Sequence, residues 1–290
     1  MFNTEEEKQS MTTSPERVSI HGGHSGQFCG HAEDQLEDIV RAYIAHGYSW
    51  VGITEHMPPE KEELSYPDEL DAGLSVADQQ ARFADYMSTC RRLRDKYASQ
   101  IRIMVGFEAE AYSGYEDWVP AVREEFEPDY IVGSVHQIND ELFDGSPEWY
   151  RAAAETVGGV DELYCAYFDR QYDVITTLAP EVIGHFDLVR IFDPDYRARL
   201  VKPDVWKRVM RNLEAIRDLG SIMDFNLAAL KKGQPEPYIS RPVLEQAREM
   251  SIAVVPGDDS HGVGNIDQYW DVGVRILRDA GFGMQWKCPA

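Results

Sequence analysis

The sequence has few cysteines and no long apolar run. Its cysteines are scattered and form no C-x-x-C pair: Cys29, Cys90, Cys165 and Cys288. We therefore expect no disulfide framework and a reducing compartment. No apolar run approaches the ~20 residues that a membrane-spanning helix needs. Residues 1–17 are polar and lack the apolar core of a signal peptide, which predicts a polar N-terminal tail on a cytoplasmic protein.

Positive charge is also scarce. The chain has 28 Lys and Arg against 51 Asp and Glu, which gives a formal net charge of −23. A surface this acidic repels the phosphates of nucleic acids and of anionic membranes. We therefore expect neither as a partner. If the substrate is a small phosphate ester, bound cations must supply the positive charge that the chain lacks. The sequence leaves the oligomeric state open.

Short apolar runs alternate with helical patterns along the rest of the chain. The predicted strands are 18–21, 50–54, 101–107, 130–135, 182–183, 222–225 and 252–255, and the main helical stretches are 34–46, 76–97, 150–178, 205–219, 241–250 and 270–280. Such alternation predicts a parallel sheet covered by helices. About seven units without a change of composition favour an α/β fold with one TIM-like barrel domain over residues 18–290. A doubly wound open sheet is the alternative.

The histidines follow the predicted strands. Seven of the eight lie at or just beyond the C-terminal end of a strand: His21, His24, His31, His56, His136, His185 and His261. Glu108 ends the third strand, and Asp258 and Asp259 follow the seventh. Because the C-terminal strand ends of a parallel barrel ring one mouth, these side chains are expected to converge. Imidazole and carboxylate ligands suit Zn, Mn or Fe, and this number of ligands is enough for two or three ions.

Six short motifs carry a family resemblance. They are Cys29-Gly30-His31-Ala32, Gly52-Ile53-Thr54-Glu55-His56-Met57-Pro58, Gly106-Phe107-Glu108, Gly133-Ser134-Val135-His136, Ile183-Gly184-His185-Phe186-Asp187 and Asp259-Ser260-His261. In this order they resemble the PHP superfamily, named for polymerase and histidinol phosphatase domains, and its histidinol-phosphatase branch most closely. The resemblance implies a distorted (β/α)7 barrel with a trinuclear metal site at the C-terminal ends of its strands.

The resemblance also implies a division of the ligands among three ions. His21, His24, Glu108 and Asp259 would hold the first ion; Glu108, His136 and His185 the second, with Glu108 bridging; His31, His56 and His261 the third. One motif departs from the family pattern, since His21 and His24 are separated by two glycines instead of one residue. An extra residue turns the second histidine to the other face of a strand unless the chain bulges, and glycine allows such a bulge.

The activity that the resemblance implies is a late step of histidine synthesis, hydrolysis of L-histidinol phosphate to L-histidinol and phosphate. Metal ions would activate the attacking water. The predicted catalytic residues are Glu108, Asp259, His261 and Asp187, and the predicted phosphate-binding residues are Lys231, Lys232 and Arg190. The segment 57–73 is expected to be a lid or a polar loop, and its Glu60, Glu62 and Glu63 would attract the ammonium group of the substrate.

Other functions stay open on the sequence alone. A related barrel would hydrolyse another small phosphate ester or a nucleotide with the same chemistry. A metal-dependent amidohydrolase also places His and Asp at strand ends, but it usually adds a lysine there, and we find none. A non-catalytic metal-binding domain is the third alternative, and the altered motif at His21 and His24 is the feature that favours it.

Overall fold

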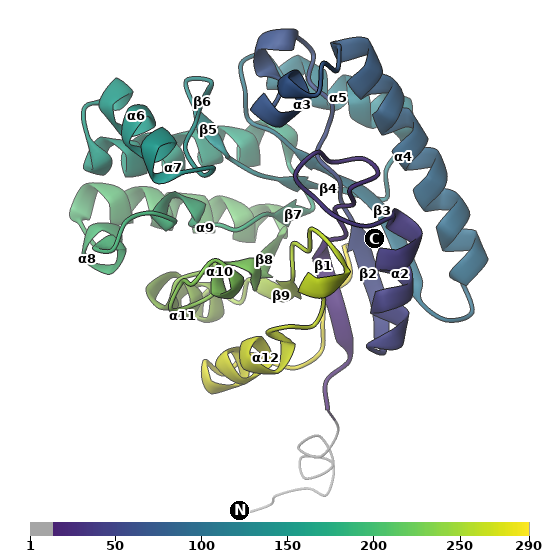
Figure 1. Cartoon of the computed structure of the whole chain (residues 1–290). Coiled ribbons are helices and arrows are strands. Elements are labelled where there is room, and N and C mark those ends of the chain that lie inside the picture. Colours follow the sequence, from purple (N-terminus) through teal and green to yellow (C-terminus); the bar gives the residue numbers. More distant parts are fainter. Residues whose placement is uncertain (1–13, 290) are drawn as a thin grey trace, which may run out of the picture.

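A computed structural model describes residues 14–289, so residues 1–13 of the predicted tail lie outside the described residues. Seven parallel strands form the central sheet, in the spatial order β1–β2–β3–β4–β7–β8–β9 (Figure 1). Their bounds are Arg17–Gly22 (β1), Tyr48–Ile53 (β2), Arg102–Ala109 (β3), Tyr130–Gly133 (β4), Val182–Ile183 (β7), Ile222–Asn226 (β8) and Ala253–Gly257 (β9). All seven predicted strands are present, with ends shifted by two residues at most.

The two edge strands, β1 and β9, meet just beyond their C-terminal ends. The backbone N–H of Asp259 donates to the carbonyl oxygen of His21 at 2.9 Å, and the N–H of His24 donates to that of Ser260 at 2.9 Å. The sheet is thus nearly closed, and the predicted TIM-like α/β barrel is confirmed. A doubly wound sheet would reverse its strand order at a switch point, and this order runs through without reversal.

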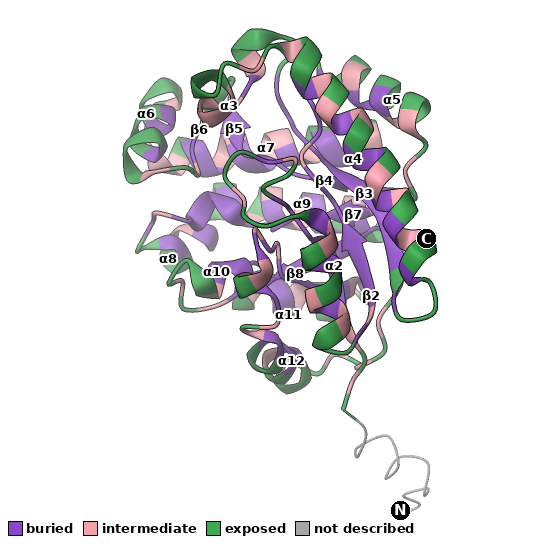
Figure 2. Cartoon of the chain, turned by 45° about the vertical axis from the view of Figure 1, so that its right-hand side comes forward, coloured by how far each residue is buried: buried purple, intermediate pink, exposed green. Residues whose placement is uncertain are grey.

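Helices surround the sheet and present their exposed faces to solvent, while the strands are buried (Figure 2). Their bounds are Leu36–Ala45 (α2), Pro67–Asp71 (α3), Val76–Tyr97 (α4), Tyr115–Phe126 (α5), Pro147–Val157 (α6), Val160–Leu178 (α7), Tyr196–Leu200 (α8), Pro203–Leu219 (α9), Ala228–Lys231 (α10), Arg241–Glu249 (α11) and Trp270–Asp279 (α12). A short hairpin joins Gln137–Ile138 (β5) to Glu141–Leu142 (β6). Within residues 14–289, the helices are too short or too polar to cross a membrane.

The predicted helical stretch 150–178 is interrupted in the structure. Gly158 and Gly159 separate α6 from α7, with φ of +103° and +137°. Backbone in this region favours glycine and ends a right-handed helix, so the two residues act as a break that apolar periodicity alone does not reveal. Helix α5 and the β5–β6 hairpin were not predicted.

Two apolar clusters hold the barrel together. The larger lies between the sheet and the surrounding helices. The smaller draws residues from all seven strands, among them Ile20, Met104, Val132 and Val255, and adds Trp270 of α12. A face shared by all strands of a closed sheet is its interior, so this cluster fills the barrel and leaves its C-terminal mouth to polar side chains.

Candidate metal centre

Glu108, near the end of β3, lies at the centre of the histidine cluster. Its Oε1 lies 3.0 Å from Nε2 of His185 and 3.4 Å from Nε2 of His136. Its Oε2 lies 3.1 Å from Nδ1 of His56 and 3.5 Å from Nε2 of His21. These four histidines come from the ends of four different strands. One buried carboxylate therefore has both of its oxygens surrounded by imidazole nitrogens, which suits a ligand that bridges two ions.

A left-handed glycine accommodates the unusual spacing of His21 and His24. Gly23 has φ of +79°, and the register of β1 against β2 is irregular between Ser19 and Gly22. Both histidines are fully buried. One nitrogen of each and an oxygen of Glu108 lie within 4.8 Å of one another. The bulge at the two glycines thus brings both histidines to one site.

A second group of donors gathers at the outer side of the cluster. The ring centroid of His31 lies 5.3 Å from that of His56 and 5.2 Å from that of His261. The side chain of His31 is 40% exposed, the most of the three. A sulfur atom joins this group, because donor atoms of His24, Cys29, His56 and His261 all lie within 4.8 Å of one another. Cys29 was not among the predicted ligands.

Buried carboxylates stand behind four of the histidines. The pairs are His21 with Asp224, His24 with Glu55, and His56 and His136 with Glu110. Asp224 lies 3.0 Å from Nδ1 of His21, and Glu110 lies 2.7 Å from Nδ1 of His136 and 3.0 Å from Nδ1 of His56. A carboxylate that binds one ring nitrogen fixes the orientation of the ring and makes the other nitrogen a better metal ligand. The sequence analysis missed all three carboxylates.

The cluster contains buried nitrogen atoms without a hydrogen-bond partner among the described residues. They are Nε2 of His21, both ring nitrogens of His24, Nε2 of His56 and Nδ1 of His185. Burying a polar atom without a partner is costly, by about 1–3 kcal/mol. The Nε2 atoms of His136 and His185 also lie only 3.1 Å apart, as two donors to one cation would. Divalent metal ions would satisfy these atoms, so the residues present fit a metal centre.

The charges of the cluster suit the same interpretation. Burial alone would raise the pKa of Glu108, but the charge of His21 and other histidines holds it well below its usual range. The pKa of Asp259 is likewise held well below its usual range, against the effect of burial, by the charge of His21 and by the neighbouring His24, whose Nε2 lies 3.4 Å away. Burial and the nearby His24 lower the pKa of His261. The carboxylates are thus in the charged state that binds metal ions. Nearby acids raise the pKa of His21, His24, His56 and His136 against the effect of burial, so these histidines would release their protons when metal binds.

The two consecutive aspartates after β9 face different surroundings. Oδ1 of Asp259 lies 3.4 Å from Nε2 of His24, and Asp259 itself has φ of +45°. Asp258 instead accepts hydrogen bonds from the hydroxyl of Tyr43 at 2.7 Å and from that of Ser19 at 2.8 Å. Asp259 therefore belongs to the cluster, and Asp258 holds the turn behind it.

A cleft of about 630 Å³ opens onto the cluster. It is lined by ligand-type side chains, among them Glu108, His136, His185, Asp259 and His261. It is also lined by Tyr66, Asp68, Asp71, Asp144, Trp149, Lys231 and Lys232. The cleft thus combines cationic, acidic and aromatic side chains with one group of ligand-type histidines and carboxylates.

Two residues predicted to take part in the reaction, Asp187 and Arg190, are buried and do not line this cleft. Arg190 is fully buried, and its guanidinium donates to the carbonyl oxygens of Glu236 at 2.8 Å and Pro237 at 2.7 Å. Asp187 accepts from the backbone N–H of Ser240 at 2.8 Å and lies 3.5 Å from Nε of Arg190. Arg190 belongs to a short 3-10 turn after β7, Leu188–Arg190, all of whose residues are buried. Both residues hold the loop that leads into α11.

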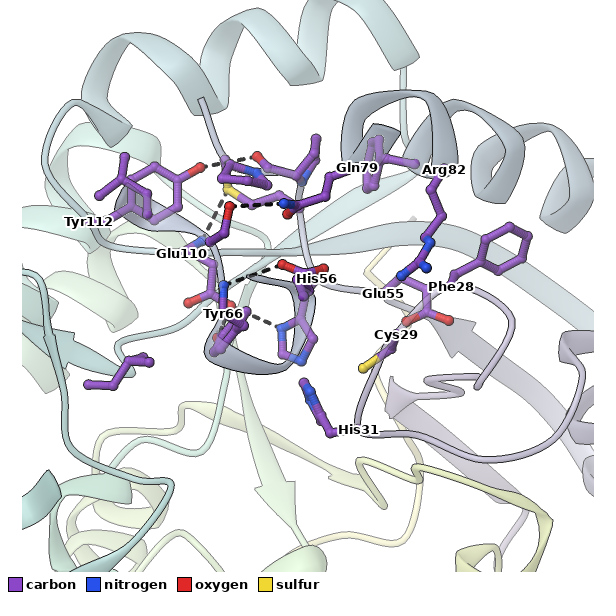
Figure 3. A pocket seen from close by; sticks show the side chains of 18 of the residues that line it. Phe28, Cys29, His31, Glu55, His56, Tyr66, Gln79, Arg82, Glu110 and Tyr112 are labelled. Carbon is purple, nitrogen blue, oxygen red and sulfur yellow. Dashed lines mark hydrogen bonds and ion pairs between the residues drawn. The ribbon is translucent and has the colours of Figure 1, made fainter. Parts of the chain in front are cut away.

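The segment 57–73 lies against the cluster. The hydroxyl of Tyr66 donates to Oε1 of Glu110 at 3.0 Å, and Oδ2 of Asp68 lies 3.4 Å from Nδ1 of His31. The segment also covers a smaller cavity of about 70 Å³, which Figure 3 shows beside His56 and Cys29. The glutamates that were expected to attract the substrate lie elsewhere: Glu60, Glu62 and Glu63 are exposed, and Glu63 borders the smaller cavity. The acids that this segment contributes to the large cleft are Asp68 and Asp71.

A nearly closed parallel barrel with a cluster of ligand-type histidines and carboxylates at its C-terminal mouth is typical of metal-dependent enzymes. A model of the PHP domain matches residues 22–228, and the chain belongs to this family. A relative from Schizosaccharomyces pombe named "Probable histidinol-phosphatase" is 36% identical over 249 residues, which cover 84% of this chain and 80% of the relative. The histidinol-phosphatase of Saccharomyces cerevisiae is 25% identical over 87% of this chain and 85% of its own length.

Solved structures share the fold. A crystal structure from Listeria monocytogenes, provisionally named histidinol phosphatase, has a TM-score of 0.78 and 25% identity, and the match covers 88% of this chain and 99% of that one. The histidinol phosphate phosphatase of Lactococcus lactis, solved with zinc, L-histidinol and phosphate, has a TM-score of 0.69. It is 20% identical, and the match covers 95% of this chain and 100% of that one.

Proposed function

We propose that this chain is a metal-dependent phosphatase whose substrate is L-histidinol phosphate, and that the reaction releases L-histidinol and phosphate. The observation that carries the proposal is the cleft itself, which is lined by histidines and carboxylates of the ligand type together with lysines, further acids and aromatic rings. The names of the relatives support the choice of substrate. L-Histidinol phosphate carries a phosphate, an ammonium group and an imidazole ring, and the side chains that line the cleft offer a complement to each.

We propose that two or three divalent ions bind the cluster, and the zinc in the Lactococcus lactis structure makes zinc the first metal to test. Glu108 would bridge two ions, with His136 and His185 on one side and His21, His24 and Asp259 on the other. The ions would supply a Lewis acid for the phosphoryl oxygens and a water acidic enough to attack at neutral pH.

The side chains of the chain itself would position the substrate. Lys231 and Lys232 border the cleft and would bind the phosphate with their ammonium groups. Asp144, Asp68 and Asp71 would face the ammonium group of the substrate. Trp149 is 39% exposed although it is large and aromatic, which leaves its ring free to pack on an imidazole. Because Glu110 and Asp224 fix the rings of the histidines, the donor set is organised before the substrate arrives.

The experiment that tests this function is phosphate release from L-histidinol phosphate by Mn- or Zn-loaded protein, beside a panel of other phosphomonoesters. We expect the highest kcat/KM for L-histidinol phosphate, and a loss of activity by several orders of magnitude in Glu108→Gln. A clear preference for another ester would keep the phosphatase and overturn the substrate. Equal turnover by Glu108→Gln would overturn the proposed role of the cluster.

A further inference from the structure

One sulfur atom lies among the nitrogen donors of the cluster. Cys29 belongs to the loop after β1, where its N–H donates to the carbonyl oxygen of Ser25 at 2.8 Å in a tight turn. The turn directs its side chain inward, so that Cys29 is only 5% exposed. Figure 3 shows its sulfur pointing toward the ring of His56. Its Sγ lies within 4.8 Å of donor nitrogens of His24, His56 and His261.

The nitrogens beside this sulfur also point to a ligand. His24 is fully buried, and neither of its ring nitrogens has a hydrogen-bond partner among the described residues. Nε2 of His56 is buried and unpartnered as well. The ring of His261 stacks on that of His24 with centroids 4.3 Å apart, so the nitrogens of the two rings lie close together. A cation there would satisfy nitrogen and sulfur donors together.

We propose that Cys29 is a thiolate ligand of the ion that His56 and His261 hold. The family resemblance gave this ion three histidines, with His31 as the third. In the structure His31 stands at the mouth, 40% exposed with Nδ1 beside Asp68, whereas the sulfur lies inside. The proposal rests on the metal centre and not on the identity of the substrate.

A thiolate ligand would give this position a metal selectivity that differs from that of the rest of the centre. Soft sulfur ligands select zinc over Mn and Mg, whereas imidazole and carboxylate accept several of these metals. The ion beside Cys29 would therefore be zinc even where the ions around Glu108 exchange for Mn. The chain would then hold one tightly bound zinc and one or two exchangeable ions.

The test is a titration of the metal-free protein with Co(II), followed by absorbance. A cysteine ligand produces a thiolate-to-cobalt charge-transfer band in the near ultraviolet, which histidine and carboxylate ligands do not. We expect this band in the wild type and its loss in Cys29→Ser, with the visible cobalt bands of the other sites retained. We also expect Cys29→Ser to bind one zinc ion at least about 10-fold more weakly, since even residues behind the ligands contribute 10–100-fold.

Cys165→Ser is the matched control, because Cys165 lies on α7, is partly exposed and should leave the band unchanged. If Cys29→Ser does not fold, X-ray absorption of the zinc-loaded wild type decides, since a thiolate adds a sulfur shell at about 2.3 Å. Full metal content without the band or the sulfur shell would overturn the proposal, as would a band that persists in folded Cys29→Ser. A chain that binds no Co(II) would overturn the metal centre as a whole, whereas the band without turnover of L-histidinol phosphate would overturn only the substrate.

Discussion

Oε2 of Glu110 lies 2.7 Å from Nδ1 of His136. The other oxygen of the same carboxylate lies 3.0 Å from Nδ1 of His56 and accepts a hydrogen bond from the hydroxyl of Tyr66 at 3.0 Å. Glu110 thus joins two histidines that contribute to different parts of the metal cluster. It also connects the segment 57–73 to both, so its removal should affect more than one ion.

We expect Glu110→Gln to bind metal more weakly by about 10–100-fold, because an amide cannot accept from two imidazoles and a phenol with the strength of a carboxylate. The measurement is metal content after dialysis against a graded series of free zinc concentrations. Glu116→Gln, an exposed change on α5, is the control. Normal metal content in Glu110→Gln would show that the rings of His56 and His136 keep their orientation without the carboxylate of Glu110.

Gly23 should be needed both for folding and for the metal centre. Its φ is +79°, and a Cβ there would lie 2.4 Å from Cδ1 of Ile53. Gly47 has a similar φ of +76°, but a Cβ there would meet nothing within 4 Å. We expect Gly47→Ala to lose about 1–2 kcal/mol of stability from the left-handed backbone alone and to keep its metal ions.

Gly23→Ala should lose more stability than Gly47→Ala and should also lose metal, because relief of the clash moves the bulge that places His24. Chemical unfolding and metal analysis of the two variants separate the backbone effect from the effect on the site. Equal metal content in the two variants would contradict this role of the bulge.

Glu37 should stabilise the chain in a pH-dependent way. Hydrogen bonds from Lys96 and Tyr97 lower the pKa of this partly exposed carboxyl to about 2. A carboxyl with a lowered pKa contributes stability above its unfolded pKa of about 4.3, and this stability is lost as the pH falls toward 2. We expect Glu37→Gln to have a lower Tm than the wild type at pH 7, and the difference to shrink between pH 4 and pH 2. Glu214→Gln, an exposed change on α9, should show no such trend.

Much of the fold and the donor set could be predicted because both depend on regular patterns. Buried parallel strands are short apolar runs, and the residues after them meet at one mouth whatever lies between. This is why His136 and His185, which are far apart in sequence, were placed together with Glu108. The helix break at Gly158 and Gly159 depends on local backbone conformation and was missed.

The residues behind the ligands were harder to find from the sequence, although two of them left a signal. Asp224 is a charged residue within the apolar run 222–225, and it is fully buried. Glu110 lies two residues after Glu108, so both side chains leave the chain on the same side of an extended segment. Arg190 was expected to bind phosphate near the mouth, whereas in the structure it is buried in the 3-10 turn after β7 and donates to the carbonyl oxygens of Glu236 and Pro237. Cys29 becomes a candidate metal ligand only in the folded structure, where the turn after β1 places its sulfur beside donor nitrogens of His24, His56 and His261.

Lys232 should bind the phosphate of the substrate. It borders the cleft at the end of α10, beside Lys231, whose Nζ already donates to Asn265 at 2.6 Å. We expect Lys232→Ala to raise KM by roughly 10-fold, the loss of about 1.4 kcal/mol that one ion pair with a phosphate contributes. Steady-state kinetics at several salt concentrations measure this, and the exposed Lys207→Ala on α9 is the control. An unchanged KM would place the phosphate on the metal ions alone.

Asp144 should recognise the ammonium group of L-histidinol phosphate. It borders the large cleft together with Trp149, whereas Glu60, Glu62 and Glu63 lie on exposed positions of the segment 57–73. We therefore expect Asp144→Asn to raise KM for L-histidinol phosphate by about 10-fold, while KM for p-nitrophenyl phosphate, which has no ammonium group, stays the same. The triple variant with Gln in place of Glu60, Glu62 and Glu63 should change neither constant, although it removes three times as much charge. If the triple variant raises KM for the aminated substrate and Asp144→Asn does not, the attraction acts at long range from the segment and not within the cleft. Because the two esters share the phosphate and the metal centre, their comparison isolates recognition of the ammonium group from the chemistry.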